Sequence, residues 1–236
     1  VNMAKEVIVK ASTIAKRKKR YTKTKVVISI ILLVMIFAFI ILSIIYKGGQ
    51  FTITLDQRLA NDNKIVIYED NEIKENKRKL SARELEFMDN ISIDWIPTNI
   101  DTEANGSHNG DNYIAYTFYV ENEGTDTVDY WYSIVIDDVI KNVDEAARVM
   151  IYLNGEKTVY AKINALTNEP EKDTTPFFSK DKAVLEERKA FSPGDIDKFT
   201  VVIWLEGDDP DCTDNILGGE IKMHMEIREE YTDPNE

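Results

Sequence analysis

Residues 26–46 read VVISIILLVMIFAFIILSIIY, and this stretch decides how the rest of the chain is organised. It has no charge, no glycine and no proline, and its polar residues are the two serines Ser29 and Ser43. A helix of this length reaches about 31 Å at ~1.5 Å per residue, which matches the roughly 30 Å hydrocarbon core of a bilayer. Soluble helices rarely carry so long an uninterrupted apolar run. The stretch predicts one transmembrane helix, Val26–Tyr46, in contact with membrane lipid.

The charge of the chain changes sign across this stretch. Residues 1–25 contain nine Lys or Arg and one acid, Glu6, a net charge of +8. Of the 29 basic and 42 acidic residues in the chain, 20 and 41 therefore lie in residues 47–236, a net charge of −21. The positive-inside rule assigns the basic flank to the cytoplasm. We expect a basic cytoplasmic segment, 1–25, and an acidic extracellular domain, 47–236, on the plasma membrane.

The apolar stretch is longer than the apolar region of a cleaved signal peptide, which is about 7–15 residues. The sequence at and after its end, Ser43-Ile44-Ile45-Tyr46-Lys47-Gly48-Gly49, has no small-x-small pair at a plausible cleavage distance. We therefore expect a retained signal-anchor. The acidic exterior domain repels nucleic acid, so nucleic-acid binding is excluded.

Cys212 is the single cysteine, so the sequence contains no internal disulfide. Small secreted domains often depend on disulfides, whereas a domain approaching 190 residues buries enough core without them. A disulfide-free, acidic exterior domain is typical of a bacterial surface, and most of all of a Gram-positive one.

Short runs of β-prone residues fill most of the exterior domain, and nothing alternates strand with helix. Lys198–Leu205 (KFTVVIWL) is apolar on both faces, which predicts a central strand, and Ala183–Phe191 is a candidate edge strand. Asn154-Gly155 between two runs predicts a hairpin with a type I′ turn. The remaining predicted strands are Gln50–Leu55, Lys64–Tyr68, Tyr113–Val120, Thr127–Ile136, Val149–Leu153, Lys157–Ile163 and Glu220–Ile227. This pattern predicts an all-β, antiparallel two-sheet sandwich of the jelly-roll or Ig-like kind.

Catalytic motifs are missing from the sequence. The two histidines, His108 and His224, do not form HExxH, and His224 falls on the predicted solvent face of a strand. Cys212 has no activating base beside it and is expected to be a part-buried, inert thiol. No Gly-rich phosphate loop or GxSxG is present. The chain is therefore predicted not to be an enzyme and to have no catalytic residues.

One polar segment has the spacing of a calcium loop. Ca²⁺ takes six to eight oxygens on a flexible loop, and glycine at the sixth position makes the bend. Gly106 stands at that position, but position 12 is Asn112 where a bidentate Glu is usual. The predicted ligands of this weak site are Asp101, Glu103, Asn105, Ser107 and Asn109. An ordinary polar turn is the alternative, and the acidic loop Glu206–Asp214 is a second, weaker candidate.

Three segments resemble a family of uncharacterised surface-protein domains of Firmicutes. They are YIAYTFYVENEG (Tyr113–Gly124), DVIKNVDEAARVMIYLNGEKTVYAK (Asp138–Lys162) and PGDIDKFTVVIWLEGDDPDCTDNILGGEIKMHM (Pro193–Met225). The pattern is distantly similar to camelysin and the TasA-like biofilm-fibre proteins, and this resemblance implies a jelly-roll sandwich. The chain departs from them in its retained span and basic flank, which argue against assembly into free fibres.

Taken together, these features predict a membrane-anchored exterior domain with a structural or protein-interaction role, which binds a protein partner or its own copies. A camelysin-like surface hydrolase is an alternative, although no metal-ligand motif supports it. The ectodomain of a membrane sensory or assembly complex is another, in which the basic flank would contact the partner.

Overall fold

The computed structural model describes residues 21, 23–41, 50–85 and 87–230, and the chain divides into two units between residues 48 and 49. In the first unit, the helix Lys23–Ile41 is long and apolar enough to cross a membrane. This confirms the predicted apolar helix as far as Ile41. Residues 42–46 and nearly all of the basic segment 1–25 lie outside the described residues. A signal sequence near the N-terminus can also form a helix that is long and apolar enough to meet this criterion, so the helix alone fixes neither retention nor orientation.

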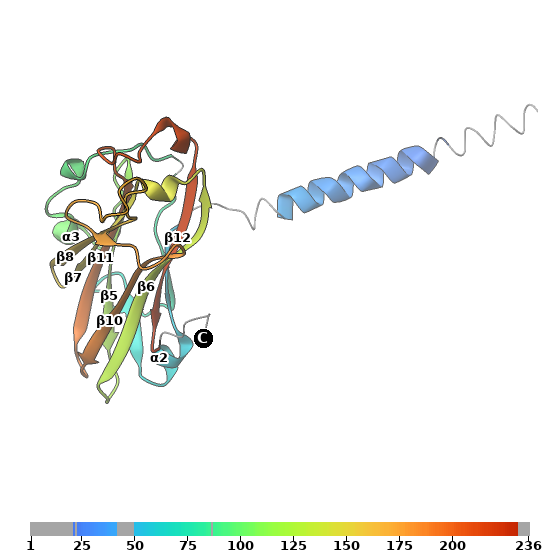
Figure 1. Ribbon diagram of the computed structural model, residues 1–236. Coiled ribbons are helices and arrows are strands. Elements are labelled where there is room, and N and C mark those ends of the chain that lie inside the picture. Colours follow the sequence, from blue (N-terminus) through green and yellow to red (C-terminus); the bar gives the residue numbers. More distant parts are fainter. Residues whose placement is uncertain (1–20, 22, 42–49, 86, 231–236) are drawn as a thin grey trace, which may run out of the picture. The chain divides into compact units, whose positions relative to one another are not determined.

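The second unit consists mainly of strands, which form two sheets (Figure 1). The five-stranded sheet has the order β10 (Lys182–Phe191), β6 (Val128–Ile140), β12 (Glu220–Arg228), β1 (Thr52–Leu55) and β3 (Lys79–Ser81). The seven-stranded sheet has the order β2 (Ile65–Tyr68), β5 (Tyr113–Asn122), β11 (Ile196–Leu205), β7 (Ala147–Leu153), β8 (Glu156–Ala161) and β9 (Thr175–Pro176), with β4 (Gly106–Ser107) beside β5. Short helices are α2 (Gln57–Asn61), α3 (Ile100–Glu103), η1 (Ile93–Trp95), η2 (Val143–Glu145) and η3 (Asp214–Ile216).

The predicted strands are confirmed in kind and place. β11 lies inside its sheet between β5 and β7, and β10 lies at the edge of the other sheet. The β7–β8 hairpin turns at Asn154 and Gly155, with φ of 54° and 88°. Positive φ at both central residues is what a type I′ turn requires, and Asn and Gly adopt it most readily.

The prediction of purely antiparallel sheets was wrong, because both sheets are mixed. β1 runs parallel to β12, with Thr52 opposite His224, and β8 runs parallel to β9. Parallel neighbours need a long connection between them, whereas antiparallel ones can be joined by a tight turn. Nearly the whole unit separates β1 from β12, so no turn constrains their relative direction.

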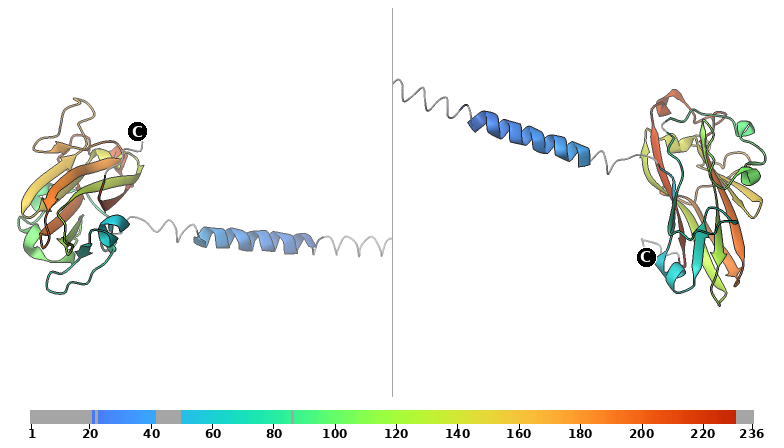
Figure 2. Two further views of the ribbon diagram at one scale, coloured as in Figure 1. Left: turned by 90° about the horizontal axis from the view of Figure 1, so that it is seen from below. Right: turned by 180° about the vertical axis from the view of Figure 1, so that it is seen from behind.

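The strands of the two sheets are seen from two further sides in Figure 2. Residues of both sheets share one hydrophobic cluster. Phe118 and Phe199 of the seven-stranded sheet stack at 5.2 Å between ring centroids. Tyr132 of the five-stranded sheet meets Phe199 edge-on at 5.1 Å. Such aromatic pairs add to the free energy gained by burying apolar area. The facing side chains therefore hold the sheets together.

A second cluster covers the outer face of the seven-stranded sheet. Val202 and Trp204 of β11 point away from the main core and are fully buried. The segment that carries η1 and α3 lies over them and contributes Ile91, Ile96 and Ile100. β11 is thus buried on both faces, as its sequence predicted.

Candidate functional site

A groove of about 740 Å³ lies on the outer face of the seven-stranded sheet. Met150 of β7 and Val159 of β8 form its buried floor, with Trp204 of β11 beside them. One wall is the segment 92–98, on the β11 side, and the other is the segment 171–174, which leads into β9. The lining residues are Ser92, Ile93, Asp94, Ile96, Pro97, Thr98, Arg148, Met150, Tyr152, Lys157, Val159, Glu171, Lys172, Asp173, Thr174, Trp204, Glu206, Asp208 and Asp209.

A buried ion pair closes one end of the groove. Arg148 of β7 donates to the carboxylate of Asp209, and both side chains are at most 4% exposed. Arg148 also donates from Nη1 to the carbonyl of Ala147 at 3.2 Å. A buried charge is tolerated when it is paired and hydrogen-bonded, so this pair fixes the loop after β11 against β7.

Glu206 fastens one wall of the groove to the sheet. Its Oε2 accepts the Trp204 indole N–H at 3.1 Å and the Ile93 backbone N–H at 3.1 Å. Its Oε1 accepts the Asp208 N–H at 3.2 Å. Because the buried carboxylate is engaged on both oxygens, it positions the wall.

The groove has an excess of negative charge. Six carboxylates and three cationic side chains line it. Arg148 pairs with Asp209, and Lys172 lies 3.9 Å from Asp173. When these two pairs are set aside, the described lining residues include four carboxylates and one cation, the exposed Lys157. An apolar floor under an acidic rim can bind a group that is both apolar and cationic.

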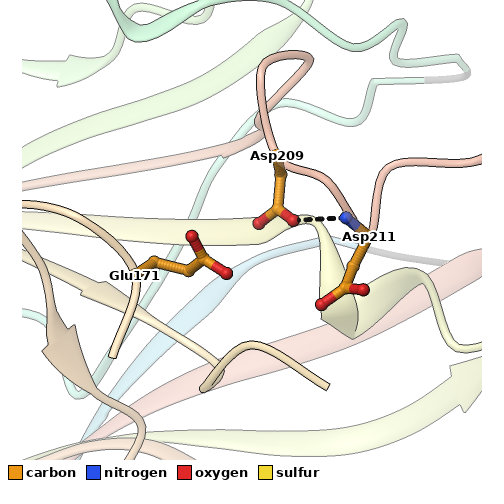
Figure 3. Close-up of side chains that lie close together, drawn as sticks. All are labelled: Glu171, Asp209 and Asp211. Atoms are coloured by element: carbon orange, nitrogen blue, oxygen red, sulfur yellow. Dashed lines mark hydrogen bonds between the residues drawn. The ribbon is translucent and has the colours of Figure 1, made fainter. Parts of the chain in front are cut away.

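Three carboxylates lie close together (Figure 3), and two of them, Glu171 and Asp209, line the groove. Oxygens of Glu171, Asp209 and Asp211 lie within 4.8 Å of one another, on two different loops. Oxygen ligands of this kind suit a hard cation. The Asp211 oxygen also accepts the Ala165 N–H at 3.0 Å, and Glu171 accepts from Asn164 at 2.9 Å. The Ala165–Asp211 bond ties the segment 164–174 to the loop after β11, and the Asn164–Glu171 bond lies within that segment.

Asp209 and Asp211 belong to the second acidic loop that the sequence suggested for calcium, Glu206–Asp214. Their companion Glu171 was missed by the sequence reasoning. It comes from a polar loop almost forty residues earlier, and no spacing rule links the two loops. The structure brings the three carboxylates together, and calcium binding there stays a prediction.

The first predicted calcium loop is divided between two elements. Asp101 and Glu103 lie on α3. Burial, together with the charge of Glu103, raises the pKa of Tyr113 above its ordinary value. Burial and the charge of Asp101 do the same for Tyr152. Both carboxylates thus act on tyrosines of neighbouring strands.

The other predicted ligands have hydrogen-bond partners inside the protein. Asn105 Oδ1 accepts from the Tyr119 hydroxyl at 2.9 Å. Asn109 Oδ1 accepts the Ala115 N–H at 3.0 Å and the Ser107 hydroxyl at 3.3 Å. A calcium ion would have to replace these bonds with metal–oxygen contacts. Calcium binding by this loop stays a prediction.

The two histidines lie far apart in the fold. His108 contacts backbone carbonyls, those of Gly106 at 3.0 Å and Ile100 at 3.2 Å. His224 lies between two carboxylates, with Nδ1 2.7 Å from Asp137 and Nε2 3.2 Å from Glu226. Since each ring nitrogen of His224 faces a different carboxylate, its partners do not converge on one point as metal ligands would.

Cys212 is part-buried, as the sequence predicted, and its sulfur accepts from Asn90 Nδ2 at 3.2 Å. Among the described residues that line the groove there is neither a cysteine nor a histidine. The polar groups of the groove are therefore carboxylates, hydroxyls, one tyrosine and three cations.

Comparison with known proteins gives no family for this chain: no family model and no curated protein matches it. Two crystal structures of β-glucosidase from Kluyveromyces marxianus, one with glucose bound and one Se-Met labelled, are similar at 11% and 12% identity and TM-scores of 0.26 and 0.25. They cover 72% of this chain, which spans only 16% and 17% of theirs. At such TM-scores the likeness carries no argument.

Proposed function

We propose that the chain is a single-pass plasma-membrane protein whose exterior domain, residues 47–236, builds surface structure or binds other proteins without catalysis. Residues 26–46 stay in the membrane as a signal-anchor, and residues 1–25 remain in the cytoplasm. The charge change from +8 to −21 supports this orientation. The disulfide-free, acidic composition supports a Gram-positive cell surface.

The exterior domain is, in this proposal, a two-sheet sandwich of the jelly-roll kind. In support, successive strands cross between the sheets, from β5 to β6 to β7 and again from β10 to β11 to β12. Within each sheet the neighbours are distant in sequence, as in β5–β11 and β6–β12, while β7–β8 is a hairpin. Double-sheet jelly rolls are built by this kind of alternation. The parallel pairing of β1 with β12 departs from this arrangement.

The groove is the observation that carries the functional proposal. Its volume lies in the range of protein ligand sites, about 300–1,000 Å³, and its floor is apolar. The buried polar groups at its end, Arg148, Asp209 and Glu206, are bonded within the protein. A preformed groove whose buried polar groups are already hydrogen-bonded within the protein supports binding over hydrolysis.

The proposal is tested by cross-linking at the surface of intact cells. The full chain with a C-terminal affinity tag is treated with a membrane-impermeant cross-linker and recovered. We expect a defined adduct that is absent when residues 50–236 are replaced by an unrelated secreted domain. Recovery of the same products from both chains would contradict the proposal, as would metal-dependent cleavage of casein by the purified chain.

A further inference from the structure

We infer that the groove binds a cationic, extended polypeptide segment presented by another molecule outside the cell. The inference rests on the proposed function, because it names the kind of partner that the exterior domain takes. The proposed partner segment contains Lys or Arg side chains together with apolar side chains.

The shape of the groove favours an extended chain. The floor runs across the neighbouring strands β7 and β8, where Met150 lies opposite Val159. The segments 92–98 and 171–174 stand on opposite sides of this floor, since β11 lies on one side of β7 and β9 on the far side of β8. A segment lying between the two walls would contact the apolar floor along its length. Recognition of peptides in grooves uses such a floor for affinity and the rim for specificity.

The charge of the groove selects a cationic segment. Asp94 on one wall and Asp208 at the end are exposed carboxylates without an ion-pair partner among the described residues. Asp173 on the other wall forms a 3.9 Å ion pair with Lys172, its one ion-pair partner among the described residues. Lysine and arginine lay their aliphatic stems on apolar surface while the charged head reaches a polar rim. The net charge of the exterior domain repels an anionic partner at longer range.

A triple variant removes the rim charges without changing shape: Asp94→Asn, Asp173→Asn and Asp208→Asn. All three side chains are exposed. Asp173 has φ of 58°, a left-handed conformation in which asparagine is well tolerated. The variant takes charge from both walls and leaves Lys172 without its carboxylate. The variant should therefore fold like the unchanged chain and differ from it in the charge of the groove.

A matched control removes three carboxylates elsewhere: Glu72→Gln, Glu84→Gln and Glu123→Gln. These side chains are also exposed and do not line the groove. The control chain has the same net charge as the groove variant. Any difference in peptide affinity between the two variants is therefore caused by the position of the removed carboxylates.

The probe is a fluorescein-labelled decapeptide of alternating Lys and Val, and its binding to the detergent-solubilised full chain is followed by fluorescence anisotropy. We expect the groove variant to bind roughly tenfold more weakly, as the loss of three exposed ion pairs implies, with the control unchanged. The affinity should fall as salt is raised from 50 to 300 mM. A peptide with Glu in place of Lys should not bind.

Equal weakening in both variants would overturn the inference, because net charge alone would then explain binding. So would failure of the Lys peptide to bind, or tighter binding of the neutral oligosaccharide chitotetraose. The cell-surface experiment separates the two proposals. If the groove variant still captures the cross-linked partner, the inference fails and the proposed function stands. If no partner is captured while the peptide binds the groove, the proposed function fails.

Discussion

The carboxylate of Asp197 joins the two sheets inside the domain. It lies on β11, its side chain is 1% exposed, and it accepts the Tyr130 hydroxyl of β6 at 2.6 Å. It also accepts Arg188 Nε of β10 at 3.0 Å and Asn154 Nδ2 at 2.7 Å. Burial, helped by the nearby carboxylate, holds the pKa of Tyr130 well above its usual value, so the hydroxyl stays a donor.

Asp197→Ala should lower the free energy of unfolding by about 3–5 kcal/mol, because it leaves a guanidinium and a phenol without their buried partner. Urea denaturation of the detergent-solubilised chain, followed by tryptophan fluorescence, measures this. Glu123→Ala, at an exposed position, should stay within about 0.5 kcal/mol. A loss below about 1 kcal/mol for Asp197→Ala would mean that the sheets do not depend on this network.

His224 makes stability depend on pH. Its hydrogen bond to Glu226, and then that to Asp137, raise its pKa above the ordinary value against the effect of burial. The pKa of Glu226 is lowered to about 2, first by His224 and then by Arg228. At pH 5.5 the cluster therefore holds an imidazolium between carboxylates.

A folded pKa above the unfolded value of about 6.5 means that His224 stabilises the fold fully below that pH. The contribution is lost as pH rises through the folded pKa. His224→Gln should therefore destabilise the domain more at pH 5.5 than at pH 9, in denaturation curves at both values. A difference that does not change with pH would show that only packing was lost.

The predicted calcium loop has a direct thermal test with Asp101. At 1 mM Ca²⁺ and a dissociation constant of ~0.1 mM, binding to the folded state adds about 1.4 kcal/mol, a rise in Tm of roughly 2–4 °C. The expected rise is measured against EDTA, and Asp101→Ala should remove it. No rise, or the same rise in the variant, would leave the loop as a polar turn.

Among the elements, β11 contributes to the core between the sheets and to the cluster on the outer face. Ile203 belongs to the core between the sheets, and its neighbour Trp204 to the cluster on the outer face. Ile203→Ala should lower the free energy of unfolding by about 2–5 kcal/mol, the range for truncating a packed aliphatic side chain. Thermal melting of the full chain measures this, with the exposed Ile73→Ala as control. A loss below about 1 kcal/mol would contradict a central role for the strand.

The strands could be predicted because their patterns are local. Alternation of apolar residues marks β12, in which Met223, Met225 and Ile227 are buried and Ile221 is part-buried. Aromatic and β-branched residues mark β5 and β6. The parallel pairing of β1 with β12 left no such mark, since direction depends on contacts between the ends of the domain. The fold class was therefore readable, and the mixed sheets were not.

The groove could not be predicted for the same physical reason. Its floor comes from β7 and β8, but its walls come from segments some eighty residues apart, 92–98 and 171–174. The short helix η1 of the first wall forms within residues 91–96, which in sequence are one more apolar run. The polar partners of Glu206 and Asp209 are set by tertiary packing. From the sequence alone, the loop Glu206–Asp214 could be recognised only as acidic.

At the scale of the whole molecule, charge is distributed so that orientation should follow from it. The basic cluster KRKKR, Lys16–Arg20, precedes the apolar stretch, and the domain after it is strongly acidic. Basic residues beside a span resist translocation and are attracted to anionic lipid by about 1 kcal/mol each near the surface. An acidic domain carries no such restraint. The two halves therefore favour the same orientation.

This orientation predicts which residues a protease can reach. Protease added to intact, wall-stripped cells should degrade residues 47–236 and spare residues 1–25, as followed with one epitope tag at each end. Permeabilised cells serve as the control, because there the N-terminal tag should be lost too. Replacing the five residues Lys16–Arg20 with glutamine should weaken the preference and leave a fraction of the C-terminal tag protected. Full protection of the C-terminal tag in the unchanged chain would reverse the orientation, and a mature N-terminus just after Gly49 would remove the anchor.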